Sequence, residues 1–131
     1  MKTVITFGTF DLFHIGHLNI LKRAAKLGDT LIVGVSSDEF TNRKKGRYPI
    51  IPEADRIAIV ESIKGVDSVF IEESLEQKRE YITRYNADIL VMGDDWKGAF
   101  DYLNNVCSVV YLSRTPGVCT TDLIKNLQQK I

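Results

Sequence analysis

The stretch TFGTFDLFHIGHLNILKRA, residues 6–24, contains the end of a strand, a glycine-bounded loop and the start of a helix. Residues 2–8, KTVITFG, form a short β-branched run that ends at Gly8, which is typical of a buried strand. From Gly16 to Leu27 apolar residues recur at helical spacing, and Gly28 follows as a helix stop. This order of strand, loop and helix sets the pattern for the rest of the chain.

The alternation continues to the C-terminus. Further β-rich runs cover residues 30–36, 67–72, 88–93 and 107–113, and helical patterns cover residues 53–63, 75–86 and 121–130. The basic, proline-containing segment TNRKKGRYPIIP, residues 41–52, is predicted to be a loop. The pattern predicts a single-domain α/β fold over residues 1–131, Rossmann-like, with a five-stranded parallel sheet and helices on both faces. In such sheets ligands bind beyond the carboxyl ends of the strands, so the loops after residues 8, 36, 93 and 113 could converge on one crevice.

The composition excludes several classes of protein. The 131 residues carry 17 acidic and 17 basic side chains, so net charge recruits neither nucleic acid nor a membrane surface. The N-terminus turns polar too soon for a signal peptide, and no apolar run approaches the ~20 residues of a membrane helix. Two cysteines, Cys107 and Cys119, are too few for a disulfide framework, which favours a reduced, cytoplasmic protein.

Both histidines of the chain, His14 and His17, lie three positions apart at the predicted start of the first helix, with Gly16 between them. A helix N-terminus presents free N–H groups and the positive end of its dipole, which attract anions. Imidazole N–H groups placed there could hold phosphate oxygens and stabilise charge on a leaving pyrophosphate. The pattern predicts a phosphate clamp.

Two alternatives remain for this pair. Both residues could be ordinary, partly buried histidines. They could also ligate a metal together with Asp11, although no further histidine or well-placed cysteine completes a coordination shell. A Mg²⁺ ion bound mainly by nucleotide phosphates, with help from Asp11, is favoured over a dedicated metal site.

Three segments carry a resemblance to a known family. GTFDLFHIGH, residues 8–17, resembles the HxGH motif of the nucleotidylyltransferase superfamily, and RTPGVCTT, residues 114–121, resembles the RTxGxSTT motif of its cytidylyltransferase branch. VMGDDWKGAFD, residues 91–101, is similar to a stretch in the bacterial glycerol-3-phosphate cytidylyltransferases within that branch. The resemblance covers essentially the whole chain.

The resemblance implies a direct transfer, in which a phosphomonoester oxygen attacks the α-phosphorus of CTP and pyrophosphate leaves. Such a reaction needs mainly positioning and charge stabilisation, and the chain shows no pairing of a nucleophile with a base. The implied acceptor is glycerol 3-phosphate, the product is CDP-glycerol for cell-wall or capsular polymers, Mg²⁺ accompanies the nucleotide, and the protein is a homodimer. Alternatives are cytidylyl or adenylyl transfer to another small phosphorylated alcohol or sugar, and a domain that senses CTP without turnover.

The resemblance also implies roles for individual residues. The catalytic set is His14, His17, Lys44 and Arg114. The nucleotide-binding set is Thr9, Phe10, Gly16, Arg56, Asp94, Arg114, Thr115, Gly117, Cys119, Thr120 and Thr121, with Asp95 beside it. The acceptor-binding set is Asp11, Asp67, Lys78 and Trp96.

Some of these assignments have a structural alternative. Asp11 could cap a loop, Trp96 could be a core side chain, and Arg56 or Lys44 could be solvated surface cations. Cys119 stands where the family usually has serine, and its thiol is a weaker hydrogen-bond donor. Leu75 stands where the family has tryptophan, which puts the choice of acceptor in question.

Overall fold

The computed structural model describes residues 1–130, which are built around a five-stranded, all-parallel sheet. The strands are β1 (Thr3–Gly8), β2 (Thr30–Ser36), β3 (Ser68–Glu72), β4 (Ile89–Gly93) and β5 (Ser108–Leu112), in the order β3-β2-β1-β4-β5. The chain starts at β1 in the middle of the sheet, builds outward to β3, and returns to add β4 and β5 on the other side. The strand order therefore reverses between β1 and β4, where parallel sheets place their ligands.

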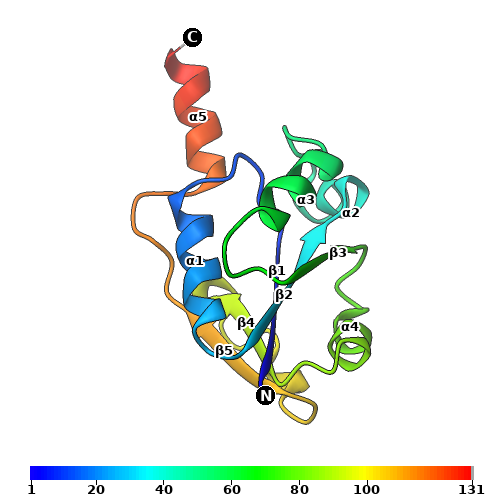
Figure 1. Cartoon of the computed structure of the whole chain (residues 1–131). Helices are drawn as coiled ribbons and strands as arrows, with labels where there is room; N and C mark the ends of the chain where they lie inside the picture. Colours follow the sequence, from blue (N-terminus) through cyan, green and yellow to red (C-terminus); the bar gives the residue numbers. More distant parts are fainter. Residues whose placement is uncertain (131) are drawn as a thin grey trace.

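Helices cover both faces of the sheet (Figure 1). Helices α1 (Ile15–Ala25) and α3 (Glu53–Glu61) pack on one face, while α4 (Lys78–Arg84) and the 3₁₀ turn Asp101–Leu103 pack on the other. Helix α2 (Asp38–Lys45) lies at the carboxyl edge of the sheet, with the 3₁₀ turn Asp94–Trp96 directly after β4. Helix α5 (Thr120–Lys130) extends beyond that edge, away from the N-terminus (Figure 1). The predicted fold class is confirmed.

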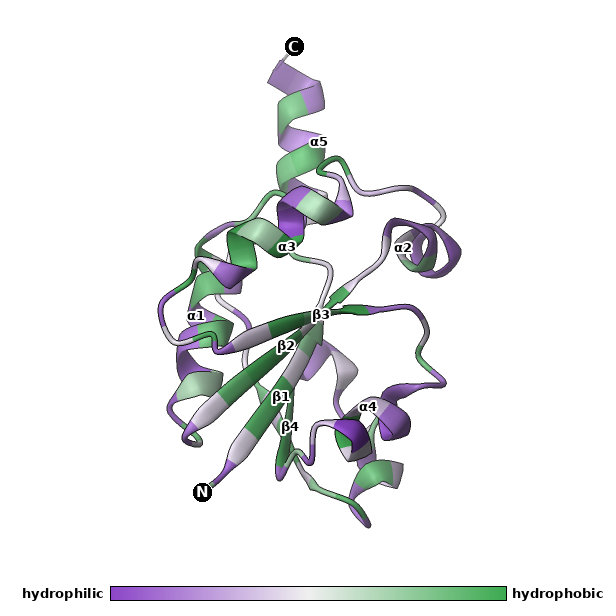
Figure 2. Cartoon of the chain, turned by 45° about the vertical axis from the view of Figure 1, so that its right-hand side comes forward, coloured by the Kyte–Doolittle hydropathy of each residue, from purple (hydrophilic) through white to green (hydrophobic). Residues whose placement is uncertain are grey.

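Two apolar layers form because side chains alternate between the faces of each strand. The strands are green along most of their length in Figure 2, as expected for a sheet that is covered on both sides. The layer under α1 and α3 contains Val4, Leu21, Ala24, Leu31, Val33, Val60 and Val91. The layer under α4 contains Ile5, Phe7, Ile32, Tyr81, Ile82, Leu90 and Leu103. Neither layer needs a disulfide, and both cysteines of the chain are free thiols.

The predicted loop over residues 41–52 is wrong in its first half, because α2 continues through Lys45. Ser37 caps this helix by accepting a hydrogen bond from the Phe40 N–H at 3.0 Å. Gly46 ends the helix in the left-handed conformation, with φ of 74°. The basic residues occupy the last turn, where the negative end of the helix dipole stabilises positive charge. The charge run therefore stabilises a helix end.

Among residues 1–130, none of the helices combines the length and the apolar character that a transmembrane span requires.

Candidate active site

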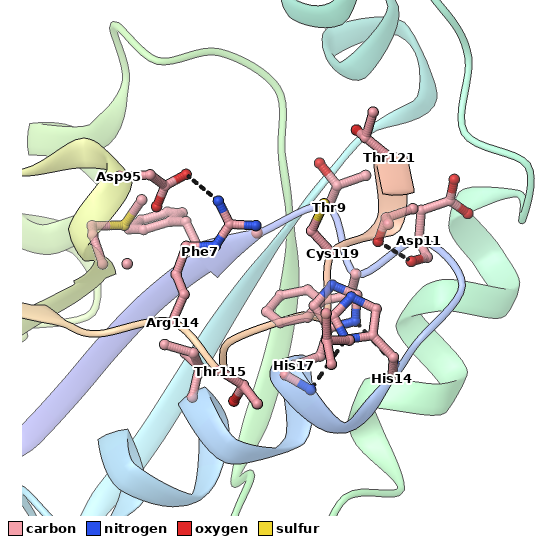
Figure 3. A pocket seen from close by; sticks show the side chains of 18 of the residues that line it. Phe7, Thr9, Asp11, His14, His17, Asp95, Arg114, Thr115, Cys119 and Thr121 are labelled. Atoms are coloured by element: carbon pink, nitrogen blue, oxygen red, sulfur yellow. Dashed lines mark hydrogen bonds and ion pairs between the residues drawn. The ribbon is translucent and has the colours of Figure 1, made fainter. Parts of the chain in front are cut away.

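A cavity of about 400 Å³ opens at the carboxyl ends of β1 and β4, where the strand order reverses (Figure 3). The loop after β1, the start of α1, the end of β4 and the segment between β5 and α5 surround it. Thirteen of the predicted site residues line this cavity: Thr9, Phe10, Asp11, His14, Gly16, His17, Asp95, Trp96, Arg114, Thr115, Cys119, Thr120 and Thr121. The cavity therefore joins the two sequence motifs in one site.

The two histidines cap helix α1 with their own side chains. His14 is the N-cap residue, and its Nδ1 accepts a hydrogen bond from the Gly16 N–H at 3.1 Å. His17 Nδ1 accepts from the His14 N–H at 3.1 Å, which completes a reciprocal capping box. A ring nitrogen that accepts a hydrogen bond carries no proton, so each neutral imidazole must carry its proton on Nε2. The backbone thereby selects the tautomer of both rings.

Both imidazoles are electrically neutral donors near neutral pH. Burial, followed by the nearby His14, Lys45 and Arg114, lowers the pKa of His17 to about 3. Burial, and then Arg114, also lowers the pKa of His14. The rings stack with centroids 3.7 Å apart, a geometry in which two positive charges would repel. Nε2 of His14 is buried and has no hydrogen-bond partner within residues 1–130, so its N–H can serve an anion in the cavity.

Two glycines of this loop are required by close contacts. Phe10 has a positive φ of 56° and packs its ring against His17, with centroids 5.4 Å apart. A Cβ at Gly8 would lie 2.9 Å from the Phe10 ring. A Cβ at Gly16 would lie 2.9 Å from Cε1 of His14. The glycines therefore leave room for the rings that form the cavity wall.

The second motif is bonded directly to the first. Thr120 Oγ1 donates to the carbonyl oxygen of Asp11 at 2.8 Å, across 109 positions of sequence. Asn19 Nδ2, on α1, donates to Thr115 Oγ1 at 3.0 Å. These bonds place the N-terminus of α5 opposite the imidazole pair, with the cavity between them (Figure 3).

Cys119 is the residue that caps α5. Its Sγ accepts a hydrogen bond from the Asp122 N–H at 3.4 Å, and the helix begins at the next residue, Thr120. Thr120 and Thr121 are therefore the first two residues of the helix. The position that is usually serine in the family is therefore a cap as well as a cavity-lining group, and sulfur is a weak acceptor there.

Besides Asp11, three charged side chains line the cavity. Arg114 lies 3.9 Å from the carboxylate of Asp95 (Figure 3), and Lys45 lines the wall near them. Burial, and then Arg47, lowers the pKa of Lys45, while Asp11 and Asp95 act in the opposite direction. The sequence predicts Lys44 at the site, whereas the structure places Lys45 there. Successive side chains of a helix point about 100° apart, so Lys44 and Lys45 face different directions. Only the helical register of α2 indicates which of the two faces the cavity.

Lys44 and Asp94 lie outside the cavity wall, although both neighbour a residue that lines it. Lys44 Nζ donates to Ser36 Oγ at 2.9 Å, at the end of β2. Burial lowers the pKa of Lys44 to about 8, against an opposing effect of Glu72. Asp94 is exposed at the start of the 3₁₀ turn that carries Asp95.

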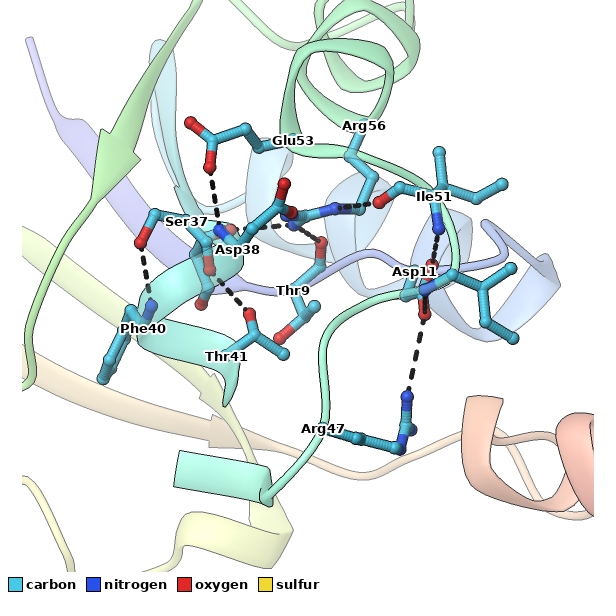
Figure 4. Close-up of polar contacts among 12 residues, drawn as sticks. Thr9, Asp11, Ser37, Asp38, Phe40, Thr41, Arg47, Ile51, Glu53 and Arg56 are labelled. Carbon is cyan, nitrogen blue, oxygen red and sulfur yellow. Dashed lines mark hydrogen bonds and ion pairs between the residues drawn. The ribbon is translucent and has the colours of Figure 1, made fainter. Parts of the chain in front are cut away.

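Arg56 does not reach the cavity, because its guanidinium is fully buried and bonded to backbone (Figure 4). It donates to the carbonyl oxygens of Ile51, Thr9 and Ser36 at 2.7–2.8 Å, and it pairs with Asp38 at 2.7 Å. Arg56 was predicted to contact the nucleotide, but in the structure it bonds the backbone of the loop that contains Thr9. The alternative of a surface arginine is wrong as well.

Asp11 lines the cavity with its carboxylate already engaged. The two oxygens accept hydrogen bonds from the N–H groups of Ile50 and Ile51 at 2.9 Å each, and Arg47 lies 3.9 Å away (Figure 4). This is the loop-capping alternative stated above. Within residues 1–130 no three acidic, histidine or cysteine side chains gather as a metal site, and the geometry gives no support to a metal held by Asp11, His14 and His17.

Two predicted acceptor residues lie in different places. Asp67 precedes β3, and its carboxylate accepts from the Leu31 N–H at 2.8 Å at the opposite edge of the sheet. It cannot touch a ligand in this cavity. Lys78 is buried behind the cavity, paired with Glu72, with its Nζ 3.9 Å from the centroid of the Phe7 ring. Phe7 itself lines the cavity.

The remaining predicted residues occupy intermediate positions. Trp96 lines the cavity while its ring packs on buried Phe100, with centroids 5.4 Å apart, so the core and site interpretations both apply. Gly117 lies outside the wall in the turn before α5, where its φ of 77° favours glycine. Leu75 packs against the apolar layer under α4.

Comparisons with known proteins agree on one family. The family model described as Cytidylyltransferase-like matches residues 5–126. The glycerol-3-phosphate cytidylyltransferase of Bacillus subtilis (strain 168) is 50% identical over 123 residues, which is 94% of this chain and 95% of that protein. The enzyme of the same name from Staphylococcus aureus (strain NCTC 8325 / PS 47) is 44% identical over 130 residues, covering 99% and 98%. The crystal structure of the lipopolysaccharide core biosynthesis protein from Thermoplasma volcanium GSS1 superposes with a TM-score of 0.75 at 30% identity, covering 88% and 98%.

Proposed function

The chain belongs to the cytidylyltransferase-like family, and from this premise we propose that it transfers the cytidylyl group of CTP to glycerol 3-phosphate, giving CDP-glycerol and pyrophosphate. The observation that carries the proposal is the joining of two neutral, backbone-capped imidazoles and the N-terminus of α5 around one cavity. Relatives that share the chain's length and nearly half of its residues are named for this reaction.

The proposed chemistry starts with the triphosphate between the two motifs. The Nε2–H groups of His14 and His17 donate to phosphate oxygens, and the N–H groups of the first turn of α5 face them from the other side. Arg114 and Lys45 supply positive charge. These fixed donors stabilise the charge that grows on the α-phosphoryl group and on the departing pyrophosphate. The acceptor's phosphate oxygen displaces pyrophosphate directly, since the reaction needs no covalent enzyme intermediate.

The residues present fit a Mg²⁺ ion that arrives with the nucleotide. Asp95 is a half-exposed carboxylate on the cavity wall, and Mg²⁺ commonly combines one or two carboxylates with substrate phosphates. When bound, such an ion neutralises part of the triphosphate's charge. Asp11 is less suited to hold it, because both of its oxygens accept backbone hydrogen bonds.

The acceptor is proposed to bind between the cavity and two lysines, the buried Lys78 and the half-buried Lys44. Lys78 and Lys44 lie on the side of the sheet that carries Phe7, next to the cavity floor. A phosphate monoester is dianionic and short, so two ammonium groups can hold its phosphate while an oxygen reaches the nucleotide. Trp96 lines the same cavity and can cover the acceptor or the nucleoside.

Two further expectations belong to the proposal. The substrates and the two free thiols fit a reducing, cytoplasmic location. A homodimer is expected from the family resemblance, and light scattering of the purified protein measures it directly.

Turnover with defined substrate pairs tests the function. The purified protein is incubated with Mg²⁺, each of CTP, ATP, GTP and UTP, and each of glycerol 3-phosphate, ribitol 5-phosphate, phosphocholine and phosphoethanolamine. We expect pyrophosphate release and CDP-glycerol, identified by mass spectrometry, with CTP and glycerol 3-phosphate, and a strong loss of both in His14→Ala. Release with ATP only would replace the cytidylyl assignment with adenylyl transfer, and binding of CTP without any release would indicate a sensor.

A further inference from the structure

A buried cluster behind the cavity contains a carboxylate that the mechanism above does not use. Its members are Ser36, Lys44, Glu72 and Lys78, here called the lysine–glutamate cluster. Ser36 and Glu72 end the neighbouring strands β2 and β3 and are paired in register. Ser36, Glu72 and Lys78 are each at most 1% exposed. A carboxylate at such a depth requires partners, because an isolated buried charge is costly.

One carboxylate orients both ammonium groups of the cluster. Glu72 Oε2 forms an ion pair and hydrogen bond with Nζ of Lys78. Glu72 Oε1 accepts from Ser36 Oγ at 3.3 Å, and Ser36 Oγ in turn accepts from Nζ of Lys44 at 2.9 Å. Lys78 is therefore held directly and Lys44 through a hydroxyl group. The two lysines come from α4 and α2, so Glu72 and Ser36 link these two helices at their lysines.

The cluster carries one more positive charge than negative charge. Burial lowers the pKa of both Lys44 and Lys78, and Glu72 opposes this effect at each of them. The other charged groups that face Lys44 are Lys45, Lys78 and Arg56, and all three act to lower its pKa. A dianionic phosphate beside these ammonium groups would supply the missing negative charge. Lys78 reaches the Phe7 ring, which is part of the cavity wall, so such a phosphate would lie next to the nucleotide.

We propose that Glu72 is a positioning residue that holds Lys44 and Lys78 in place to receive the phosphate group of the acceptor. This inference rests on the proposed function, since it takes the acceptor to be a small phosphate monoester. Glu72 acts through the two lysines and does not touch the substrate. Ser36 extends its effect to Lys44, because its hydroxyl can accept from the ammonium group and donate to the carboxylate at the same time.

Steady-state kinetics of Glu72→Gln test this role. We expect the KM for glycerol 3-phosphate to rise about tenfold or more, because an amide cannot replace a charged acceptor for two ammonium groups. The KM for CTP should change by less than about twofold. The matched control is Glu80→Gln, which removes the exposed ion pair with Arg84 on the same helix as Lys78 and should leave both KM values unchanged.

The pH profile distinguishes positioning from a structural effect. In the wild type, kcat/KM for the acceptor should fall as pH rises through about 8, because Lys44 then loses its proton. Without Glu72 this fall should move to lower pH, since the group that raises the pKa of Lys44 is gone. A fall at unchanged pH, or equal rises in both KM values, would overturn the proposal.

A second variant covers the case in which Glu72→Gln does not fold. Ser36→Ala removes the hydroxyl group that links Lys44 to Glu72 and leaves the ion pair of Glu72 with Lys78 in place, so it should raise the acceptor KM by a smaller factor and shift the same pH limb. Unchanged acceptor kinetics in Ser36→Ala would overturn the role of the cluster. A wild-type protein without any turnover of glycerol 3-phosphate would instead overturn the proposed function, so the two failures are distinguishable.

Discussion

Each histidine of this chain performs two tasks with its two nitrogens. Nδ1 caps helix α1 and Nε2 is left as a donor toward the cavity, so the fold itself sets the proton's position. The sequence predicts a phosphate clamp at a helix start, but it does not show that the rings cap that helix. A capping box normally uses serine or threonine with glutamate or glutamine, so imidazoles in these positions give no standard capping signal.

Two variants with amide side chains, His17→Asn and His17→Gln, separate the capping role of His17 from its proposed catalytic role. His17→Asn can place an oxygen where Nδ1 accepts from the His14 N–H, but it has no group near Nε2. His17→Gln can place an N–H near Nε2 instead. We expect kcat to fall by about 10²–10³-fold in His17→Asn, with the melting temperature kept, and to fall less in His17→Gln, whose helix is less stable.

The measurements are kcat at saturating substrates and thermal unfolding followed by circular dichroism. If His17→Asn retained the wild-type kcat, the donor role of Nε2 would be excluded, and only the cap would remain as the function of this residue.

At the level of elements, the ends of helices decide the site. Helix α1 begins at the imidazole pair, and α5 begins at the cysteine cap. Helix α2 places Lys45 on the cavity wall and Lys44 next to Ser36 at the end of β2. Local signals for α2 were present in Ser37, the acidic first turn and Gly46, but the run of basic residues resembled a solvated loop. The basic residues belong to the last turn of a helix because the dipole favours cations there.

Cys119→Ser should tighten nucleotide binding. Serine is a preferred N-cap and a stronger donor and acceptor than a thiol, so α5 gains a better cap beside the proposed triphosphate site. An N-cap contributes about 0.5–2 kcal/mol, which allows a decrease of a few-fold to about tenfold in the KM for CTP. Hydrogen exchange at the amides of α5 should slow in parallel.

Cys107→Ala is the control for this prediction, because Cys107 is buried under the sheet and away from the cavity. It should lower the melting temperature and leave the KM for CTP unchanged. A Cys119→Ser variant with the same KM and the same exchange rates as the wild type would show that the cap does not affect nucleotide binding.

For the whole molecule, a single buried guanidinium joins the segments that build the cavity. Arg56 bonds the loop after β1, the end of β2 and the segment before α3, while Asp11 bonds the same segment from the other side. The site therefore depends on contacts between residues that are 20 to 47 positions apart. Arg56 therefore supports the cavity without lining it.

Arg56→Lys should destabilise the protein strongly. One ammonium group cannot serve three carbonyl oxygens and Asp38 at once, and each buried acceptor left without a donor costs about 1–3 kcal/mol. We expect the free energy of unfolding to fall by at least about 3 kcal/mol, measured by urea denaturation. The exposed Arg84→Lys is the control and should change stability by less than about 0.5 kcal/mol. Unchanged stability in Arg56→Lys would contradict the joining role.

The sequence by itself determined the fold class, because the alternation of β-branched runs and amphipathic helices leaves few alternatives to a covered parallel sheet. It also identified two segments that line the cavity, since HxGH and RTPGVCTT are local patterns. The tertiary structure decided which neighbour of a pair lines the cavity: Lys45 and not Lys44, and Asp95 and not Asp94. It placed Asp67 before β3, at the end of the strands opposite to the cavity. It also showed that the side chains of Arg56 and Asp11 bond to loop backbone. The reason is physical: a motif specifies residue types at short range, whereas the direction of a side chain depends on helix register and on backbone groups that only the folded chain brings together.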